Sequence, residues 1–361
     1  MVINSHRVFN FRNIENIEIK PDKEMNIIFG ENGQGKTNLI ESIWLMTGFY
    51  SFRTRKNALL IKEGCNKATI KTGFNSFGRG QEAEMTIGSK KELILNEVKE
   101  MSPRAMSGVF PAVVFSPSTL GIVQSGPGER RKLIDVALTQ IKPNYGKIMS
   151  QYIKVTDQRN IMLKKYGEEC FTMPSFTPWT EQLITLGSKI IKYRLDYIDK
   201  LNAISGEIYE GISSGRENFS FYYDFSRENR SEEEIAIKLR EETEKTKYQD
   251  IKYLYTNAGP HTHDVILHLN DKEAKVYGSQ GQMRSCALAM KLGEASVIRS
   301  VTGEEPVVLL DDVMSELDEK RQDFILNYLE NRQVFITCCD PSQIIRKKRG
   351  EVFCMKLGGR G

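Results

Sequence analysis

The sequence has few of the features that mark secreted, zinc-binding or membrane-spanning proteins. Its 361 residues include only six cysteines and no CxxC pair, and the four histidines do not stand beside cysteines at zinc-finger spacing. No apolar run approaches the ~20 residues that span a bilayer, and the N-terminus lacks the apolar segment of a signal peptide. These absences predict a reduced, cytoplasmic protein with no membrane partner.

An excess of one charge is also missing. Lys and Arg number 51 against 47 Asp and Glu, which gives a formal net charge of +4. A charge this small neither requires nor excludes a nucleic-acid partner, so support for one must come from local clusters. The rest of the composition is that of an ordinary folded protein, long enough for one large or two linked domains.

Hydrophobic periodicity divides the chain into three parts. Residues 1–115 contain short alternating strands, a glycine-rich loop and an amphipathic helix, and residues 257–361 again combine strands with helices. Residues 116–256 between them are mainly helical. We therefore predict an α/β core built from the first and last parts, with the middle part inserted as a helical lobe.

Apolar residues at spacings of three, four and seven predict where the helices of the lobe lie. Two are expected from Glu129 to about Glu169 and from Thr177 to about Ser213, and a third, highly charged helix near 232–254. Their heptad register is too irregular for a long coiled coil. In the last part of the chain, residues 274–278 are predicted to form a strand.

One segment matches the phosphate-binding loop pattern GxxxxGK[ST] in full. Its glycines allow backbone N–H groups to point at phosphate oxygens, and the helix that follows adds its partial positive charge. We expect Lys36 to contact the β- and γ-phosphates of ATP and the Thr37 hydroxyl to bind Mg²⁺. The alternative, a plain glycine-rich turn, does not explain the apolar strand before it. The predicted ATP-binding residues are Gly30, Glu31, Asn32, Gly33, Gln34, Gly35, Lys36 and Thr37.

A second segment, VVLLDD, supports the same chemistry independently. An apolar strand delivers Asp311 to the carboxyl edge of a parallel sheet, where a carboxylate holds Mg²⁺ directly or through water. Asp312 follows and is expected to orient or deprotonate the attacking water. The alternative is that two acids merely end a buried strand.

The stretch GSQGQ resembles the signature motif of ATP-binding-cassette proteins. Small residues, free N–H groups and a helix N-terminus make Ser279, Gly281 and Gln282 a second phosphate site far from the first loop. One ATP already has its own loop, so a second site is useful if it serves the ATP of another copy of the chain. Ser279 is therefore assigned a catalytic role in trans, and an ordinary helix cap is the alternative.

Taken together, the motifs resemble the SMC-type DNA-repair ATPases and, most closely and over essentially the whole chain, the RecF family. The segments that carry the resemblance are GENGQGKT, VVFSPSTLGIVQSGPGERRKLID, AGPHTHD, YGSQGQMRS and LLDDVMSELD. The resemblance implies the α/β fold of an ABC-type P-loop ATPase head with an inserted helical lobe. It also implies an ATP-dependent homodimer, binding to duplex DNA and gapped junctions, RecA loading with RecR and RecO, and a nucleoid-associated location.

Several positions depart from the pattern of such ATPases. Ser315 to Asp318 resemble the loop that lines the dimer seam, but Cys339 or Asp340 stands where a switch histidine is usual. The acid after Asp311 is Asp312 rather than a longer Glu, so we expect slow ATP hydrolysis. With the family resemblance, the expected activity is a weak ATPase that DNA stimulates. Ser116 replaces the glutamine of the usual Q-loop, and the segment Gly259–Asp264 lacks an expected arginine.

DNA binding requires Lys and Arg to neutralise phosphates. Arg53, Arg55 and Lys56, which follow the predicted phosphate-loop helix, form the best candidate cluster. The clusters at 129–132 and 346–350 are alternatives.

A transport-type cassette ATPase and a P-loop kinase are the competing functions. The first does not explain the helical insert, and the second leaves GSQGQ and SELD without a role.

Overall fold

The computed structural model describes residues 1–225, 231–342, 350–356 and 359–360. The chain forms two compact units. Unit 1 comprises residues 1–121, 207–216 and 284–361, and unit 2 comprises 122–206 and 217–283. Among the helices described, none is long and apolar enough to cross a membrane.

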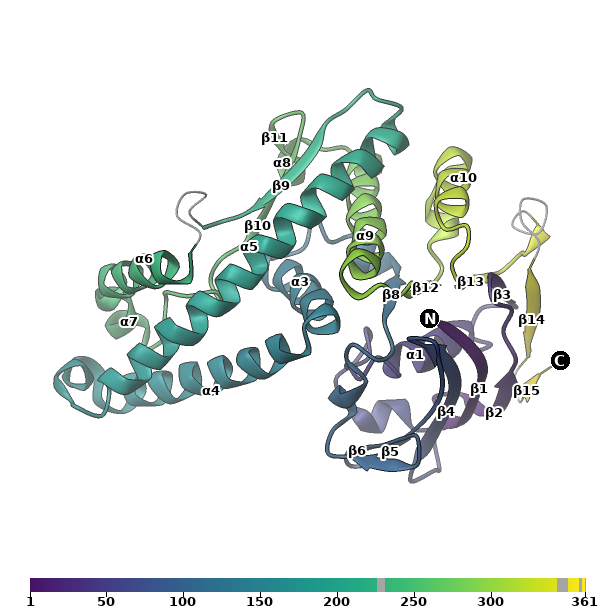
Figure 1. Cartoon of the computed structure of the whole chain (residues 1–361), viewed down its shortest axis with the longest axis horizontal. Coiled ribbons are helices and arrows are strands. Elements are labelled where there is room, and N and C mark those ends of the chain that lie inside the picture. Colours follow the sequence, from purple (N-terminus) through teal and green to yellow (C-terminus); the bar gives the residue numbers. More distant parts are fainter. Residues whose placement is uncertain (226–230, 343–349, 357–358, 361) are drawn as a thin grey trace. The chain divides into compact units, whose positions relative to one another are not determined.

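Unit 1 contains an antiparallel sheet of six strands in the order β2-β1-β4-β5-β6-β7 (Figure 1). Burial alternates along β4 as the two-residue period of a strand requires, so one face of the sheet lies against the core. The strands are β1 (Val2–Phe11), β2 (Ile14–Ile19), β4 (Ala68–Ser76), β5 (Arg79–Ile87), β6 (Lys91–Leu95) and β7 (Val98–Glu100).

The second sheet of unit 1 has the order β15-β14-β3-β13-β12-β8 and is parallel from β14 to β8. β8, β12 and β13 are buried at every residue, as expected for parallel strands covered on both faces. The strands are β3 (Met25–Phe29), β8 (Ala112–Phe115), β12 (Val307–Leu310), β13 (Val334–Cys338), β14 (Glu351–Lys356) and β15 (Gly359–Arg360).

Helix α1 (Lys36–Leu45) contacts both sheets of unit 1 through β1 and β13. Its apolar side chains Leu39, Ile40 and Ile43 are fully buried. His6 of β1 joins the helix to the antiparallel sheet, with Nε2 2.8 Å from the Ser42 hydroxyl and Nδ1 2.9 Å from Thr72. Burial lowers the pKa of His6 to about 3, so this link is neutral at physiological pH.

Short helices complete unit 1. They are α2 (Pro117–Leu120), α10 (Glu319–Tyr328) and the 3₁₀ turns η1 (Asn57–Leu60), η2 (Pro103–Met106) and η4 (Met314–Glu316). Ser116, at the position expected for the Q-loop glutamine, caps the N-terminus of α2 and forms a capping box with Thr119. The Ser116 hydroxyl accepts from Thr119 N at 3.4 Å, and Thr119 Oγ1 accepts from Ser116 N at 2.8 Å.

Unit 2 packs long helices against a three-stranded antiparallel sheet of order β11-β10-β9 (Figure 1). Three ion pairs with buried arginines, Arg130–Asp264, Arg159–Asp250 and Arg194–Asp135, join its segments at 2.6 to 2.9 Å. The elements are α3 (Pro127–Ile141), α4 (Pro143–Tyr166), η3 (Gly167–Thr172), β9 (Phe219–Tyr223), α6 (Glu232–Lys245), α7 (Lys247–Tyr253), β10 (Val265–Leu269), β11 (Lys272–Glu273) and α8 (Ala274–Tyr277), with most of α5 (Thr177–Ser213) and the start of α9 (Gln280–Thr302).

The boundaries differ from the predicted three-part division. Residues 257–283 lie in unit 2 because β10 pairs with β9, and the boundary between the units falls within α5 and α9. The helix expected over 129–169 is broken by Pro143, whose ring cannot continue a helix interior. The helix expected near 232–254 is likewise two helices.

The prediction of a strand at 274–278 is wrong. These residues form the single helical turn α8 and the glycine after it. The preceding hairpin turn passes through Asn270 and Asp271, both in the left-handed region with φ of 49° and 61°. Val276 and Tyr277 are both exposed, so the alternation of a half-buried strand is absent.

Candidate functional site

The predicted phosphate loop connects β3 to α1 in unit 1. Gly30, Gly33 and Gly35 all have positive φ, at 151°, 83° and 98°. At Gly35 a Cβ would lie 2.8 Å from the side-chain oxygen of Asn13, so both conformation and space require glycine there. This backbone turns directly into the N-terminus of α1, which is the arrangement that binds anions.

Lys36 folds back over the loop that precedes it. Its ammonium donates to the carbonyl oxygens of Gly30 at 2.6 Å and Glu31 at 3.1 Å. The residue is only 7% exposed, and Nζ lies 3.7 Å from the sulfur of Cys339, the residue directly after β13. A positive charge is therefore held at the mouth of the loop by neutral partners, in position to meet an anionic ligand.

Thr37 and Asp311 meet although 274 residues separate them in the sequence. The Thr37 hydroxyl donates to Asp311 Oδ1 at 2.9 Å, and the Thr337 hydroxyl donates to the same oxygen at 3.1 Å. Asp311 is 4% exposed, and this burial raises the pKa of its carboxyl group, although the two hydroxyl donors oppose the shift. A cation at this point would relieve the cost of the buried charge.

The donors at Thr37 and Asp311 suit magnesium. Mg²⁺ prefers oxygen ligands and is usually held by one or two protein groups, with phosphate oxygens and waters completing the shell. Within the described residues, no group of three or more His, Cys, Asp or Glu side chains is placed to hold a metal. A magnesium ion shared with a nucleotide fits these donors better than a fully protein-ligated ion.

Asp312 lies beside this pair but is exposed to solvent. It adopts a left-handed backbone conformation with φ of 56°, and its N–H donates to Thr337 Oγ1 at 2.8 Å. The turn separates the two acids, so that Asp311 faces inward and Asp312 outward. A carboxylate in this position is able to accept a proton from a water in the adjoining cavity.

These groups surround a cavity of about 190 Å³, called here the P-loop cavity. The structure thus brings together most of the residues predicted from the loop motif and the acidic strand. Its lining consists of Glu31, Asn32, Gly33, Gly35, Lys36, Thr37, Asn38, Arg53, Asp312 and Thr337.

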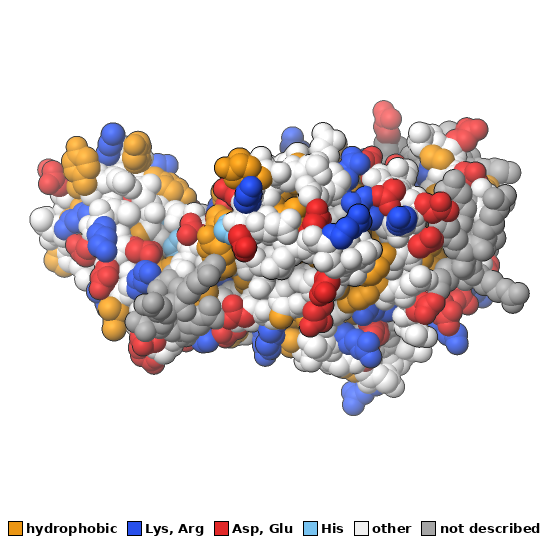
Figure 2. Space-filling model, turned by 90° about the horizontal axis from the view of Figure 1, so that it is seen from above, with side chains coloured by type: hydrophobic (Ala, Val, Ile, Leu, Met, Phe, Trp, Pro, Cys, Tyr) orange, Lys and Arg blue, Asp and Glu red, His pale blue; other side chains and the backbone are white. Residues whose placement is uncertain are grey.

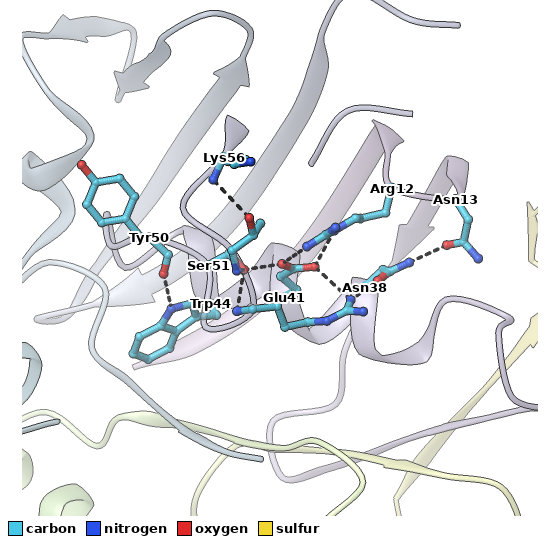
Figure 3. A network of polar contacts seen from close by, with 10 residues as sticks. Arg12, Asn13, Asn38, Glu41, Trp44, Tyr50, Ser51 and Lys56 are labelled. Carbon is cyan, nitrogen blue, oxygen red and sulfur yellow. Dashed lines mark hydrogen bonds and ion pairs between the residues drawn. The ribbon is translucent and has the colours of Figure 1, made fainter. Parts of the chain in front are cut away.

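A buried carboxylate, Glu41 of α1, organises the side of the P-loop cavity (Figure 3). It accepts from Arg12 at 2.7 and 3.0 Å, and from the hydroxyl of Ser51. Arg53 lies 3.4 Å from the same carboxylate and donates to Asn38 at 2.7 Å. Arg53, predicted to contact DNA, is therefore turned toward the nucleotide side of its loop.

Arg55 and Lys56 face solvent. No ion pair with either is present among the residues that the structure describes. Of the alternative clusters, Arg130 forms two bonds to Asp264 at 2.6 and 2.8 Å, and Arg131 donates to the His263 carbonyl at 2.6 Å, so both are used within unit 2. The cluster at 346–350 lies outside the described residues, except for Gly350.

Figure 2 shows Lys and Arg side chains interspersed with Asp and Glu over one face of the molecule. A local arrangement of cations, rather than one broad field, must therefore carry any recognition of an anion on that face.

The predicted signature segment lies in unit 2, at the start of α9. Ser279 is exposed and forms a reciprocal cap with Gln282: Ser279 N donates to Gln282 Oε1 at 2.7 Å, and Gln282 N donates to Ser279 Oγ at 3.3 Å. Gln282 also donates to Glu217 at 2.5 Å, while Gly281 is half-buried. The segment is an ordered helix start that leaves the serine open to solvent.

Two further predicted segments border the acids in unit 1. In SELD, the Ser315 hydroxyl donates to the Asp312 carbonyl at 2.9 Å, and Glu316 pairs with Arg284 of α9 at 2.5 Å. At the expected switch position, Cys339 is exposed, and its thiol donates to Asn32 Oδ1 at 3.3 Å. Thus Cys339, which the sequence could not separate from Asp340, contacts the phosphate loop.

Two residues that hold the site were not predicted from the sequence. Asn13, in the β1–β2 turn, donates to the Gly33 carbonyl at 2.8 Å and accepts from Asn38 at 2.7 Å. Thr337 supports Asp311 and Asp312 from β13. An asparagine in a hairpin turn and a threonine in an otherwise apolar strand were visible signals, but neither identifies its partner.

Comparison with known proteins places these features in a family. The model for the RecF/RecN/SMC N-terminal domain matches residues 2–354. The DNA replication and repair protein RecF of Clostridium acetobutylicum is 38% identical over 344 residues, covering 94% of this chain and 93% of that protein. A solved structure described as the recombination mediator protein RecF-ATP in the RecFOR pathway is 34% identical, with a TM-score of 0.91, and the match covers 99% of this chain and 96% of that one.

The fold itself extends to more distant proteins. An Smc head domain from Pyrococcus furiosus superimposes with a TM-score of 0.56 at 15% identity, covering 99% of this chain and 94% of that one. At this identity the likeness concerns the fold alone. It confirms the expected α/β ATPase-head architecture with its helical insert.

Proposed function

The chain belongs to the RecF family of DNA replication and repair proteins, and from that premise we propose that it is an ATP-gated DNA-binding recombination mediator. The observation that carries the proposal is the meeting of Thr37 with Asp311 beside the ammonium of Lys36. A phosphate loop and an acidic strand end joined in this way are the requirements for binding a nucleoside triphosphate with magnesium.

In the proposed nucleotide site, residues 30–37 bind the phosphates of ATP through backbone N–H groups and the Lys36 ammonium. Thr37 and Asp311 hold Mg²⁺, which supplies charge neutralisation at the phosphates when bound. Asp312 orients or deprotonates the attacking water. Lys36 and Asp312 are thus the catalytic residues contributed by the chain that holds the nucleotide.

A second copy of the chain completes the site in this proposal. Ser279, Gly281 and Gln282 of the partner bind the γ-phosphate at the N-terminus of a helix. The exposure of Ser279 supports this role, because a serine already buried in its own chain would not be accessible. Its bond to Gln282 N is the kind of local cap that a phosphate oxygen replaces without loss of hydrogen bonds.

Hydrolysis is proposed to be weak and to be stimulated by DNA. The short side chain of Asp312 and the presence of Cys339 in place of a switch histidine leave the attacking water with fewer strong hydrogen-bond partners. ATP hydrolysis then serves as a switch that opens the dimer, rather than as a source of rapid turnover.

Arg55 and Lys56 are proposed to contact the phosphate backbone of duplex and gapped DNA. Arg53 belongs to the same cluster but lines the P-loop cavity, so we assign it to nucleotide sensing at the edge of the DNA surface. The partners proposed with DNA are RecR and RecO, in loading RecA at a cytoplasmic, nucleoid-associated location.

Sedimentation velocity tests the proposal directly. The full-length protein should be a monomer alone and a dimer with ATP and Mg²⁺, and the dimer should bind duplex DNA. A Lys36→Arg variant should lose the ATP-dependent shift and keep its melting temperature. A wild-type protein that remains monomeric with ATP and DNA together would contradict the proposed ATP-gated dimer.

A further inference from the structure

A second cavity in unit 1, of about 250 Å³, has no assigned role. It is lined by the chain after α1, the β5–β6 turn and the beginning of η2, together with Asn57. Three of the lining side chains are cationic and none is acidic, so we call it the cationic cavity. Its lining is Gly48, Phe49, Tyr50, Asn57, Ser89, Lys90, Lys91, Ser102, Pro103 and Arg104.

The walls of the cationic cavity are fixed by the fold. Gly48 has a φ of 83°, and a Cβ there would collide with the carbonyl oxygen of Pro103, so the two segments pack backbone to backbone. The Tyr50 carbonyl accepts from Trp44 Nε1 of α1 at 2.9 Å (Figure 3). Asn57 Nδ2 donates to the Ser89 carbonyl at 3.4 Å. The cavity is therefore a built depression rather than a chance gathering of lysines.

Two of the three cations in this cavity, Lys90 and Lys91, have no acidic partner among the described residues. Within the described part of the chain, neither Lys90 nor Lys91 forms an ion pair, and Lys91 lies with its ammonium 5.6 Å from the centre of the Tyr50 ring. Burial lowers the pKa of Lys91 to about 8, although the charge of Glu41 opposes the shift. A partly desolvated cation without a counter-ion is unfavourable, and a bound anion would remove that cost.

The position of the cavity indicates which anion it would take. Asn57, in its lining, follows Arg55 and Lys56, whose exposed charges have no described partner. The lining thus continues the cluster proposed to meet DNA. Its volume is ample for a phosphate group with several waters, each of which occupies about 30 Å³ in the liquid.

We propose that the cationic cavity anchors one backbone phosphate of duplex DNA, with Lys90, Lys91 and Arg104 as the donors. This inference rests on the proposed DNA-binding function and deepens it. Because Tyr50 lines this cavity and Arg53, three residues later, lines the P-loop cavity, the segment between them connects the phosphate anchor with the nucleotide.

The test is the salt dependence of binding of a short fluorescent duplex to the full-length protein with ATP and Mg²⁺. Each phosphate that the protein neutralises contributes about 0.9 to the slope of log K against log salt. Because one phosphate is bound here, the double variant Lys90→Gln/Lys91→Gln should flatten the slope by about one, and Lys91→Gln alone should flatten it by part of that amount. Lys99→Gln is the matched control, because Lys99 pairs with Glu92 at 3.3 Å on the adjoining strands.

A second measurement separates binding from folding. Lys91→Gln should melt at or above the wild-type temperature, because it removes a desolvated charge and no ion pair. Unchanged slopes in the double variant would overturn the proposal, as would an equal loss of slope in Lys99→Gln. A wild-type protein that does not bind duplex DNA at all would instead refute the proposed function.

Inorganic phosphate, compared at constant ionic strength, distinguishes a free anion from the DNA backbone. If it raises the melting temperature of the wild type but not of Lys91→Gln, while the salt slopes of both remain equal, the ligand is free phosphate and the DNA anchor is refuted. The DNA anchor is supported if phosphate shifts the melting temperatures of both proteins equally and the salt slope of Lys91→Gln is flatter than that of the wild type.

Discussion

The Thr37 hydroxyl donates a 2.9 Å hydrogen bond to Asp311, so the phosphate loop and the acidic strand are in direct contact. The relationship predicts a trade between stability and activity at Asp311. Asparagine keeps an oxygen for the two hydroxyl donors but cannot neutralise magnesium. Asp311→Asn should lower ATP hydrolysis at least about 100-fold, since a metal contributes several kcal/mol at a transferring phosphate.

The same variant should show an altered pH dependence of stability. The pKa of Asp311 is raised in the folded protein from its ordinary value of 3.8, so ionisation costs folding free energy as pH rises through the folded pKa. Asp311→Asn has no carboxyl group to ionise at this position and therefore does not lose this stability. Its stability relative to wild type should be unchanged near pH 3 and should increase toward neutrality, measured by urea unfolding. A variant that becomes less stable toward neutral pH would contradict this account.

Mixing two inactive variants should reveal whether the nucleotide site is built from residues of two chains. Lys36→Arg and Ser279→Arg should each be inactive alone, because one has a defective phosphate loop and the other lacks the partner's serine. When the two variants are mixed, each dimer that contains one chain of either kind holds one intact site, so ATP hydrolysis should return, at up to half of the wild-type rate per mixed dimer. ATPase assays of the mixture measure this. Activity that stays at the level of the separate variants would argue against action in trans.

The loop after α1 should divide into a nucleotide side and a DNA side. Arg55→Gln/Lys56→Gln should flatten the salt slope of duplex binding by about two and leave ATP affinity unchanged. Arg53→Gln should do the reverse, lowering ATP affinity or hydrolysis with little effect on the slope. Titrations of labelled ATP and labelled duplex with the same preparations distinguish them. An Arg53→Gln variant with normal nucleotide properties would return Arg53 to the DNA side.

Alkylation should block the nucleotide site through Cys339. This thiol is exposed and close to Lys36, whereas burial raises the pKa of Cys338 to about 11 and leaves it almost without thiolate at pH 8. Iodoacetamide should modify Cys339, prevent ATP binding and be slowed by prior addition of ATP. Cys339→Ser is the control and should retain binding after the same treatment. Mass spectrometry identifies the modified residue.

Glu41 should be a major structural carboxylate of unit 1. Glu41→Gln leaves the charges of Arg12 and Arg53 without their partner and should cost about 3 kcal/mol of unfolding free energy. Glu15→Gln, in an exposed pair with Lys62 at 2.8 Å, is the matched control and should cost less than about 1 kcal/mol. Urea unfolding compares the two. Equal costs would mean that Glu41 does not organise the loop.

Local sequence was sufficient where a function depends on consecutive residues. The phosphate loop was predictable because its glycines, lysine and threonine act through a backbone that they shape themselves, between an apolar strand and a helix. Asp311 was predictable because a buried strand can end in an acid only where the acid has a partner or an ion. The break at Pro143 was missed, although proline gives that signal locally.

Long-range partners were not predictable from one sequence. Asn13 supports the phosphate loop, and Thr337 holds Asp311, but nothing near either residue states its partner. Arg53 is an example. Its place in a basic run predicted a DNA contact, but its interaction with the buried carboxylate of Glu41 turns it toward the P-loop cavity.

The sequence by itself therefore determined the family, the α/β class and the residues of the phosphate loop, because these depend on spacing along the chain. Only the tertiary structure decided that Thr37 meets Asp311, that Cys339 touches the loop, and that Lys91 lies half-buried with no acidic partner among the residues described. The physical reason is that the burial and the electrostatic environment of a residue depend on segments that are distant in the sequence. A single amino-acid sequence does not show which of these segments come into contact.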